Sequence, residues 1–300
     1  MMAKRKTVAT TSSKTLFGSK CTFCDQEKVV LSRLSVFVGD FSLSAAGFVA
    51  SGEEHDAQSA GVVLGLVAKS LVSARAIRSS TFYRLLDITR EHADSKLVQR
   101  GELNSIARRH AIFFSRFLQN AKIPEPRLGD YDPSAFSPHI GNVRPALEWA
   151  LSEHGDVAIA IPLVASATPV FMGLSLSGEC RRWSERAIAI LDKANRRTRR
   201  EMILHEALAV SVMDTATGGD NGVIRIAFER ALTVAEALGD QPHQRQLLAG
   251  LNLFSNGLGD LRNSRAAAER GAAIALALSD PAGAMWVEWM LGISHSFEGS

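Results

Sequence analysis

The sequence of 300 residues contains few cysteines and no long apolar run, and both shortages exclude whole classes of protein. The cysteines are Cys21, Cys24 and Cys180, an odd number that does not suit a framework of disulfide bonds. No apolar run approaches the ~20 residues that a transmembrane helix requires. The longest candidate, residues 157–172, is interrupted by two prolines. We therefore expect no membrane span and a reducing compartment, the cytoplasm.

Aromatic residues are also scarce, at 7%, and neither sign of charge dominates the composition. Alanine is abundant instead, which favours closely packed helices over a β-sandwich. Hydrophobic residues make up 46% of the chain and charged residues 22%, so most of it should fold. The formal net charge of +3 neither requires nor excludes a polyanionic partner.

A further absence is the G-x-x-x-x-G-K-[ST] loop that binds nucleotide phosphates. The nearest segment, Gly18-Ser-Lys20, is followed by Cys21 instead of Ser or Thr and lacks the upstream glycine. Without a loop to hold phosphates and a hydroxyl to hold magnesium, we expect no ATP hydrolysis by this chain.

No other catalytic or metal-binding pattern is complete. His205-Glu206 begins like a zinc-protease motif, but Ala209 occupies the position of the second histidine. Cys21 and Cys24 form a solitary C-x-x-C pair, and a structural zinc ion would need two more ligands at a suitable spacing. We therefore predict that the chain is not an enzyme and has no catalytic, cofactor-binding or metal-binding residues.

A short word repeats in the second half of the chain. Glu-Arg-Ala at 185–187 returns at 229–231, and as Glu-Arg-Gly at 269–271. Apolar residues accompany the word at i, i+4 and i+7, one stripe of an α-helix. They are Trp183, Ala187 and Ile190, then Ala227, Ala231 and Val234, then Ala267, Gly271 and Ile274. The separation matches the length of a helix pair, so the pattern predicts a helical solenoid.

The first half predicts a different unit. Helices are expected from Asp25, which would cap the first, then at 42–50 and at 57–69. Strands at 70–74 and 81–86, joined by the basic loop 74–80, would follow. Three helices and a β-hairpin make a winged helix.

We do not expect this winged helix to bind DNA by itself. The predicted helix 57–69 has few groups that could read bases or hold phosphates, and its apolar composition predicts a buried helix. Arg75 and Arg78 in the wing are the only features that favour DNA contact.

The predicted domains are a disordered leader at 1–24, a winged helix at 25–101 and a helical repeat array at 102–300, with a linker near 122–138. A helix at 87–99 would close the winged helix at Gly101. Helices of the array are expected at 102–121, 139–152, 157–172, 178–194, 201–217, 222–238, 241–255, 261–278 and 282–297. The tryptophans Trp149, Trp183, Trp286 and Trp289 are expected to fill the core between these helices.

Several segments resemble bacterial STAND-class transcriptional regulators that contain an NB-ARC-type ATPase. Leu31–Ala46, Lys69–Val72 and Tyr83–Ala93 are similar to the winged helix of that family, and Arg108–Phe114 to its junction with the sensor. Ile140–Ala150 and Gly178–Ala187 resemble the tetratricopeptide-like (TPR-like) region, especially of rhizobial members. The resemblance covers most of the chain from Asp25, and its specificity lies in the order and spacing of the segments.

The resemblance implies a mainly α fold, a winged helix followed by a TPR-like α-solenoid. In the family, a DNA-binding domain and a nucleotide switch precede these parts, and here both are absent. The chain is therefore interpreted as a truncated regulatory fragment, whose repeats bind a protein or small-molecule effector and whose winged helix relays to an ATPase module absent from this chain. The alternatives are a repeat scaffold without signalling and a winged-helix DNA-binding factor.

The densest cationic run is Asn195-Arg-Arg-Thr-Arg-Arg200. It is either a solvated turn between two helices or a contact for phosphate or for an acidic protein.

Overall fold

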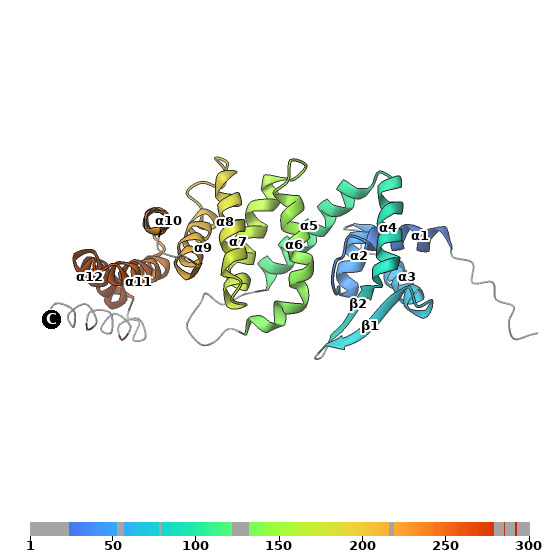
Figure 1. Cartoon of the computed structure of the whole chain (residues 1–300), viewed down its shortest axis with the longest axis horizontal. Coiled ribbons are helices and arrows are strands. Elements are labelled where there is room, and N and C mark those ends of the chain that lie inside the picture. The colour runs from blue at the N-terminus through green and yellow to red at the C-terminus, as the bar shows by residue number, and fades with distance from the viewer. Residues whose placement is uncertain are drawn as a thin grey trace, which may run out of the picture.

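The structure is a computed structural model that describes residues 24–52, 57–77, 80–121, 132–215 and 219–278, with Met285 and Gly292. In these ranges it contains twelve α-helices, one 3-10 helix and one two-stranded sheet. The predicted class is confirmed: the fold is mainly α, with a winged-helix unit followed by a TPR-like solenoid (Figure 1). Predictions about the leader before Cys24, Arg78, Trp286, Trp289 and the helix at 282–297 lie outside the described residues.

The winged-helix unit occupies one end of the elongated molecule (Figure 1). Its elements are α1 (Asp25–Leu34), α2 (Leu43–Ser51), α3 (Ala57–Ala68), β1 (Val72–Ile77), β2 (Ser80–Leu85) and α4 (Asp87–Gln99). Phe41 forms an isolated antiparallel bridge with Tyr83, so β2 has a neighbour on each side. Cys24, and not the predicted Asp25, caps α1: its Sγ accepts the Glu27 backbone N–H, and the Glu27 carboxylate accepts that of Cys24.

The first strand lies further along the chain than predicted. β1 spans Val72–Ile77, not 70–74, and pairs with β2 along its whole length. Ser70 has a φ of 59°, in the left-handed region, so the chain is still turning there and cannot yet extend. Most of the predicted loop 74–80 is therefore paired strand.

The expectation that the helix at 57–69 is buried is also wrong. Ser59, Val63 and Leu66 form a buried stripe at i, i+4 and i+7. Leu64 is 50% exposed, and Gly61 is exposed beside it on the opposite face. The cause is that α3 packs on α1 and α2 from one side, and no described element covers the other side.

The remaining elements follow one another along the long axis (Figure 1). They are α5 (Leu103–Asn120), η1 (Pro133–His139), α6 (Ile140–Ala150), α7 (Val157–Gly173), α8 (Ser177–Ala189), α9 (Arg199–Thr215), α10 (Asn221–Leu238), α11 (Gln241–Gly257) and α12 (Leu261–Ala277). Apart from the end of α8, the α-helices agree with the predicted helices to within two residues at each end. The 3-10 helix η1 was not predicted: it occupies the end of the expected linker near 122–138, where Asp132 caps it and Pro133 begins it. Gly101, with a φ of 68°, makes the predicted turn after α4.

Helix α8 ends five residues earlier than predicted, at Ala189 instead of Ala194. The Asp192 carboxylate accepts hydrogen bonds from the backbone and side-chain N–H groups of Asn195, which folds the chain into a turn. Ile190, predicted to continue the buried stripe, is therefore 37% exposed.

The array contains four equivalent first helices, α6, α8, α10 and α12, although the repeated word indicated only three. Each of them buries residues at i, i+3, i+4 and i+7. The sets are Val143, Ala146, Leu147 and Ala150; Cys180, Trp183, Ser184 and Ala187; Ile224, Ala227, Phe228 and Ala231; Ser264, Ala267, Ala268 and Gly271. Except for Ile190, the predicted stripe positions of α8 and α10 are confirmed as buried, as are Ala267 and Gly271.

The core continues from the winged helix into the array. One cluster of buried apolar residues extends from Val30 in α1 to Ala207 in α9, and a second extends from Met202 in α9 to Ala267 in α12. The apolar helix α7 lies within the first cluster, as its composition predicted. The winged helix and the array as far as α9 therefore share one packed interior, and the units beyond it pack around a second cluster.

Within the array, Gly250 of α11 leaves room for the ring of Phe228, which after Trp183 is the largest side chain of the buried sets. A Cβ atom on Gly250 would lie 2.5 and 2.7 Å from Cε1 and Cζ of Phe228 in α10. We predict that Gly250→Ala destabilises the protein by about 1–3 kcal/mol, because the buried ring cannot move aside without strain. Chemical denaturation would measure this loss.

Gly257→Ala is the matched control in the same helix. No atom lies within 4 Å of a Cβ atom at this position, so alanine should leave stability unchanged or raise it by up to ~1 kcal/mol. Equal effects of the two substitutions would contradict the packing account.

Candidate functional site

The winged helix and the array meet at Asn142, a fully buried residue of α6. Its side-chain oxygen accepts hydrogen bonds from the backbone N–H groups of Val38 and Gly39, at 2.9 and 3.3 Å. Its amide nitrogen donates to the backbone carbonyl of Asp40 at 2.7 Å. One side chain thus satisfies three backbone groups of the α1–α2 loop. We call Asn142 and residues 38–40 the joint.

Aromatic and glycine residues surround the joint. His110 of α5 lies between Phe37 and Phe114, with ring centroids 5.1 and 4.8 Å away. Burial lowers the pKa of His110 to about 3, and the neighbouring Asn142 side chain offsets part of that shift. A Cβ atom on Gly141 would lie 3.7 Å from the Cα atom of Gly39, so the two backbones approach closely.

A second contact ties the winged helix to the start of α5. The Arg33 guanidinium donates to both carboxylate oxygens of Glu102, at 2.8 and 3.2 Å, and to the Ala50 carbonyl at 2.6 Å. The hydrogen bond from Arg33 lowers the pKa of Glu102. Arg33 therefore connects α1, α2 and α5 through one forked side chain.

A ladder of arginines joins the repeat units. An arginine at i+1 of the first helix, next to the first buried residue, reaches forward to an acid at or near the start of the next first helix. The pairs are Arg144–Glu179 (2.6 Å), Arg181–Asp220 (2.8 Å) and Arg225–Asp260 (3.3 Å). Asp220 and Asp260 stand at the N-cap positions of α10 and α12. The forward rungs thus fix the spacing between successive units.

A second set of arginines, at i+6, reaches back to the preceding unit. The pairs are Arg186–Glu148 (2.8 Å), Arg230–Glu201 (2.7 Å) and Arg270–Glu236 (2.5 Å). In the first unit Trp149 occupies the position of this arginine, and its indole N–H donates to Asn104 of α5 at 2.7 Å. The arginines that sequence analysis recognised as part of a repeated word are therefore inter-unit contacts.

Glu201 is the buried member of this ladder. Its carboxylate accepts from Nε and Nη2 of Arg230, at 2.9 and 2.7 Å, and from the Arg197 backbone N–H. Burial alone would raise the pKa of Glu201, but these hydrogen bonds outweigh burial and hold the pKa below its usual value. His205 lies 4.0 Å away, with its own pKa lowered by burial. The incomplete zinc-protease motif thus lies beside a structural ion pair, and its Glu206 accepts a hydrogen bond from Gln246.

The wing arginine that favoured DNA contact is used within the fold. Arg75 of β1 pairs with the buried carboxylate of Asp40, next to the joint. The exposed face of α3 presents Leu64 and Gly61, and α3 itself contains no arginine or lysine. Base readout and phosphate anchoring both need polar or cationic side chains, and none is offered by Gly61, Leu64 and Ala68, the exposed residues of α3 whose side chains the structure describes.

A shallow pocket of about 310 Å³ lies where η1 meets the array. It is lined by Ser137, Ile140, Gly141, Arg144, Leu174 and Leu176. Its volume is at the lower end of the range of small-molecule sites, roughly 300–1,000 Å³. Arg144, its charged group, is engaged by Glu179.

Among the described residues, no group of three or more His, Cys, Asp or Glu side chains could hold a metal ion. No helix in the same part of the chain has the length and apolar character to cross a membrane.

The chain is similar in sequence to a part of three bacterial proteins. No protein-family model matches it. Curated relatives from Mycobacterium bovis and from two strains of Mycobacterium tuberculosis are each 29% identical over 224 residues. All three carry the provisional name HTH-type transcriptional regulator. The match covers 72% of this chain but 25% of each relative, so the chain spans about a quarter of the relatives' length.

Among solved structures, the chain is similar to a crystal structure from Pyrococcus horikoshii. That protein is described as a STAND (signal transduction ATPase with numerous domains) protein with a tetratricopeptide repeat sensor. The similarity covers 91% of this chain and 48% of the other, with 14% sequence identity and a TM-score of 0.43. The likeness to bacterial regulators rests on the mycobacterial relatives, and the rhizobial assignment stays a prediction.

The two backward rungs at Arg230 and Arg270 should contribute different amounts to the free energy of unfolding. Arg230→Met leaves the buried Glu201 carboxylate without its main partner, and we predict a loss of about 2–4 kcal/mol in the free energy of unfolding. Arg270→Met removes an exposed pair with Glu236 and should cost less than about 1 kcal/mol. Denaturant titration of the two variants measures both values. Equal losses would show that burial does not set the strength of the rungs.

The buried His110 should make the protein less stable in mild acid. Its pKa is about 3 in the folded protein and close to the ordinary 6.5 in the unfolded chain, so only the unfolded chain takes up this proton between those values. Stability is therefore complete above pH 6.5 and falls as the pH falls toward 3. We predict a contribution of about 2 kcal/mol to the loss between pH 7.5 and pH 5.

Replacement of the imidazole tests the assignment. His110→Phe should remove this part of the pH dependence, whereas His154→Gln, at an exposed position, should leave it intact. Thermal unfolding at several pH values gives the comparison. An unchanged slope in His110→Phe would mean that other groups, such as the half-buried His139, cause the loss.

Proposed function

We propose that this chain is the sensor and relay part of a bacterial transcriptional regulator. The repeats bind a protein or small-molecule effector, and the winged helix passes the bound state to an ATPase module that is not in this chain. The likeness to the mycobacterial regulators supports the regulatory role. Because the chain spans a quarter of those proteins, the activity of a complete regulator is part of the proposal.

The observation that supports the relay is that α6 contacts both the winged helix and α8. Asn142 on this helix holds the winged-helix loop 38–40 by three hydrogen bonds. Arg144, two residues later, is the first forward rung and binds Glu179 of α8. A displacement of α8 is thereby coupled to the winged helix through one short helix.

The contacts favour a protein effector over a small molecule. The pocket beside Arg144 is open and small, and its arginine already has a carboxylate partner. The array instead offers an elongated surface, along which the first helices α6, α8, α10 and α12 follow one another (Figure 1). Extended surfaces of this kind are what helical solenoids use to bind proteins.

The winged helix fits a relay better than a reader of DNA. Its exposed α3 face is apolar and without cations, and Arg75 is held by Asp40. An apolar face suits packing against another protein module, and DNA requires cations to hold its phosphates. We therefore expect no electrophoretic shift of DNA by this chain at low salt. A shift that weakens steeply with salt would favour a DNA-binding factor instead.

Amide hydrogen exchange at the joint tests the relay. Glu179→Gln weakens the first forward rung, and we predict that the Val38 and Gly39 amides, the donors to Asn142, then exchange roughly fivefold faster. In an Asn142→Ala background these amides should already exchange fast, and Glu179→Gln should add nothing.

Glu269→Gln is the control. This acid of α12 pairs with Arg265 within its own helix, so its loss should leave the joint unaffected. If Glu179→Gln does not change the amide exchange rate of Val38 in the wild-type background, the relay proposal fails. A repeat scaffold would then be the better interpretation.

A further inference from the structure

The turn between α8 and α9 concentrates positive charge. Residues 192–201, which we call the basic turn, contain Lys193, Arg196, Arg197, Arg199 and Arg200, all of them exposed. Both acids of the segment already have hydrogen-bond partners. Asp192 accepts the two hydrogen bonds from Asn195, and Glu201 is buried against Arg230. The surface of the basic turn is therefore cationic.

The shape of the basic turn is fixed by its own hydrogen bonds. The Thr198 hydroxyl donates to the Asn195 carbonyl at 2.7 Å, and Asn195 is buried. Arg197 has a φ of 57°, and its backbone N–H donates to the Glu201 carboxylate. A buried acid thus holds the backbone from which the arginines extend.

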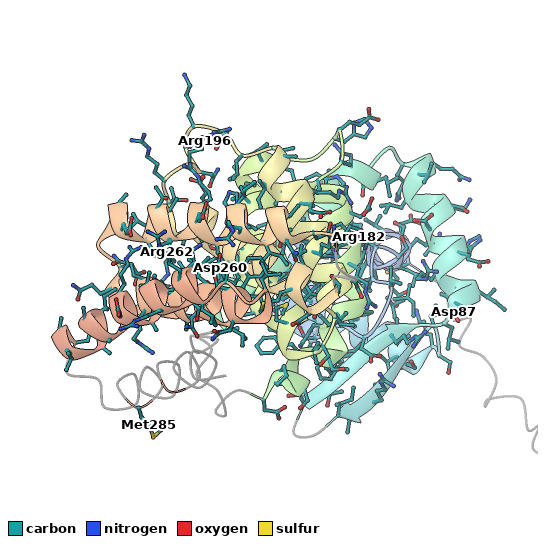
Figure 2. The ribbon with its side chains drawn as sticks, turned by 60° about the vertical axis from the view of Figure 1, so that its left-hand side comes forward. Asp87, Arg182, Arg196, Asp260, Arg262 and Met285 are labelled. Atoms are coloured by element: carbon teal, nitrogen blue, oxygen red, sulfur yellow. The ribbon has the colours of Figure 1, made fainter. Side chains whose placement is uncertain are left out.

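Three of the five cations have no partner within the described residues. The Nε of Arg196 donates to the Leu191 carbonyl, and Arg199 lies 3.8 Å from Asp240. The side chains of Lys193, Arg197 and Arg200 make no hydrogen bond or ion pair in the described part of the chain. Figure 2 shows Arg196 on a turn at the periphery of the ribbon, apart from Arg182 and Arg262.

The neighbouring turns limit the extent of this positive surface. Arg186 contacts the Leu151 carbonyl of the α6–α7 turn, and Arg199 approaches Asp240 of the α10–α11 turn, so three turns lie along one edge of the array. The α6–α7 turn contains Glu153 and Asp156, and the α10–α11 turn contains Asp240. Acidic residues therefore border the basic turn on both sides.

We infer that the basic turn is a docking surface for a carboxylate-rich segment of a partner protein. Guanidinium groups match carboxylates in geometry and charge, and the free cations occupy one short turn. Nucleic acid suits the surface less well, because its uniform charge would meet the acids of both adjacent turns, and useful affinity takes contacts to several phosphates. The inference rests on the proposed function, in which the repeats recognise a protein.

The test uses the full chain and a defined probe. A fluorescently labelled peptide of eight glutamates is titrated with the protein at low salt, and its glutamine counterpart and an eight-residue oligothymidine serve as comparisons. We expect the glutamate peptide to bind and the glutamine peptide to fail. Arg197→Glu/Arg200→Glu should weaken binding of the glutamate peptide roughly tenfold or more, because two attractions become repulsions.

Arg90→Glu/Arg262→Glu is the control, since it changes the net charge by the same amount in α4 and α12. It should alter the affinity by less than about twofold, because neither charge lies in the basic turn and Coulomb attraction weakens with distance. If the first variant lowers the unfolding temperature, Lys193→Gln/Arg200→Gln replaces it, since these side chains have no partner to lose in the described residues.

Several outcomes would overturn the inference. They are no binding of the glutamate peptide, tighter binding of the oligothymidine, or an equal loss of affinity in the control variant. Amide exchange at Val38 distinguishes this failure from failure of the proposed function. If the joint still responds to Glu179→Gln, the relay stands and only the docking surface is lost.

Discussion

The buried side-chain amide of Asn142 is the interaction on which the arrangement of this molecule depends. Backbone N–H and C=O groups that leave water must find partners, and the α1–α2 loop cannot pair its own groups at residues 38–40. Asn142 supplies one acceptor and one donor at that place. Its position is decided by α6, in which Asn142 lies between the buried residues Ile140 and Val143. The orientation of the winged helix is therefore set by the first helix of the repeat array.

Beyond α6, two kinds of contact hold the array together: burial of apolar side chains and ion pairs between arginines and carboxylates. The buried sets supply the apolar area, but small residues such as Ala187, Ala231 and Gly271 pack without a strong preference for one spacing. The arginine rungs add direction, since a guanidinium fork binds a carboxylate in few geometries. Most rungs are half exposed and contribute little energy each. Their main effect is to fix the register between units.

The repeats could be predicted from the sequence because the Glu-Arg-Ala motif contains both an arginine of the rungs and a small residue of the buried set. The motif does not mark the unit that begins with α6, because Trp149 replaces its arginine there; this helix is predicted from its own apolar pattern and from the resemblance. The remaining signal, Arg144 and Glu148 four residues apart beside a small apolar set, is weak without the structure. The joint could not be predicted, since Asn142 contacts residues more than 100 positions away. The early end of α8 depended on local turn bonds of Asp192 that compete with a helical pattern.

These constraints limit how a signal could cross the molecule. A single apolar cluster extends from α1 to α9, and tightly packed interiors move between discrete arrangements instead of deforming continuously. Helix α6 cannot turn without carrying Asn142, and the loop it holds continues directly into α2 and the Phe41 bridge to β2. The hairpin would therefore move with the repeats as one body. Arg75 of the wing pairs with Asp40 of the same loop, so this contact ties the hairpin to the segment that Asn142 holds.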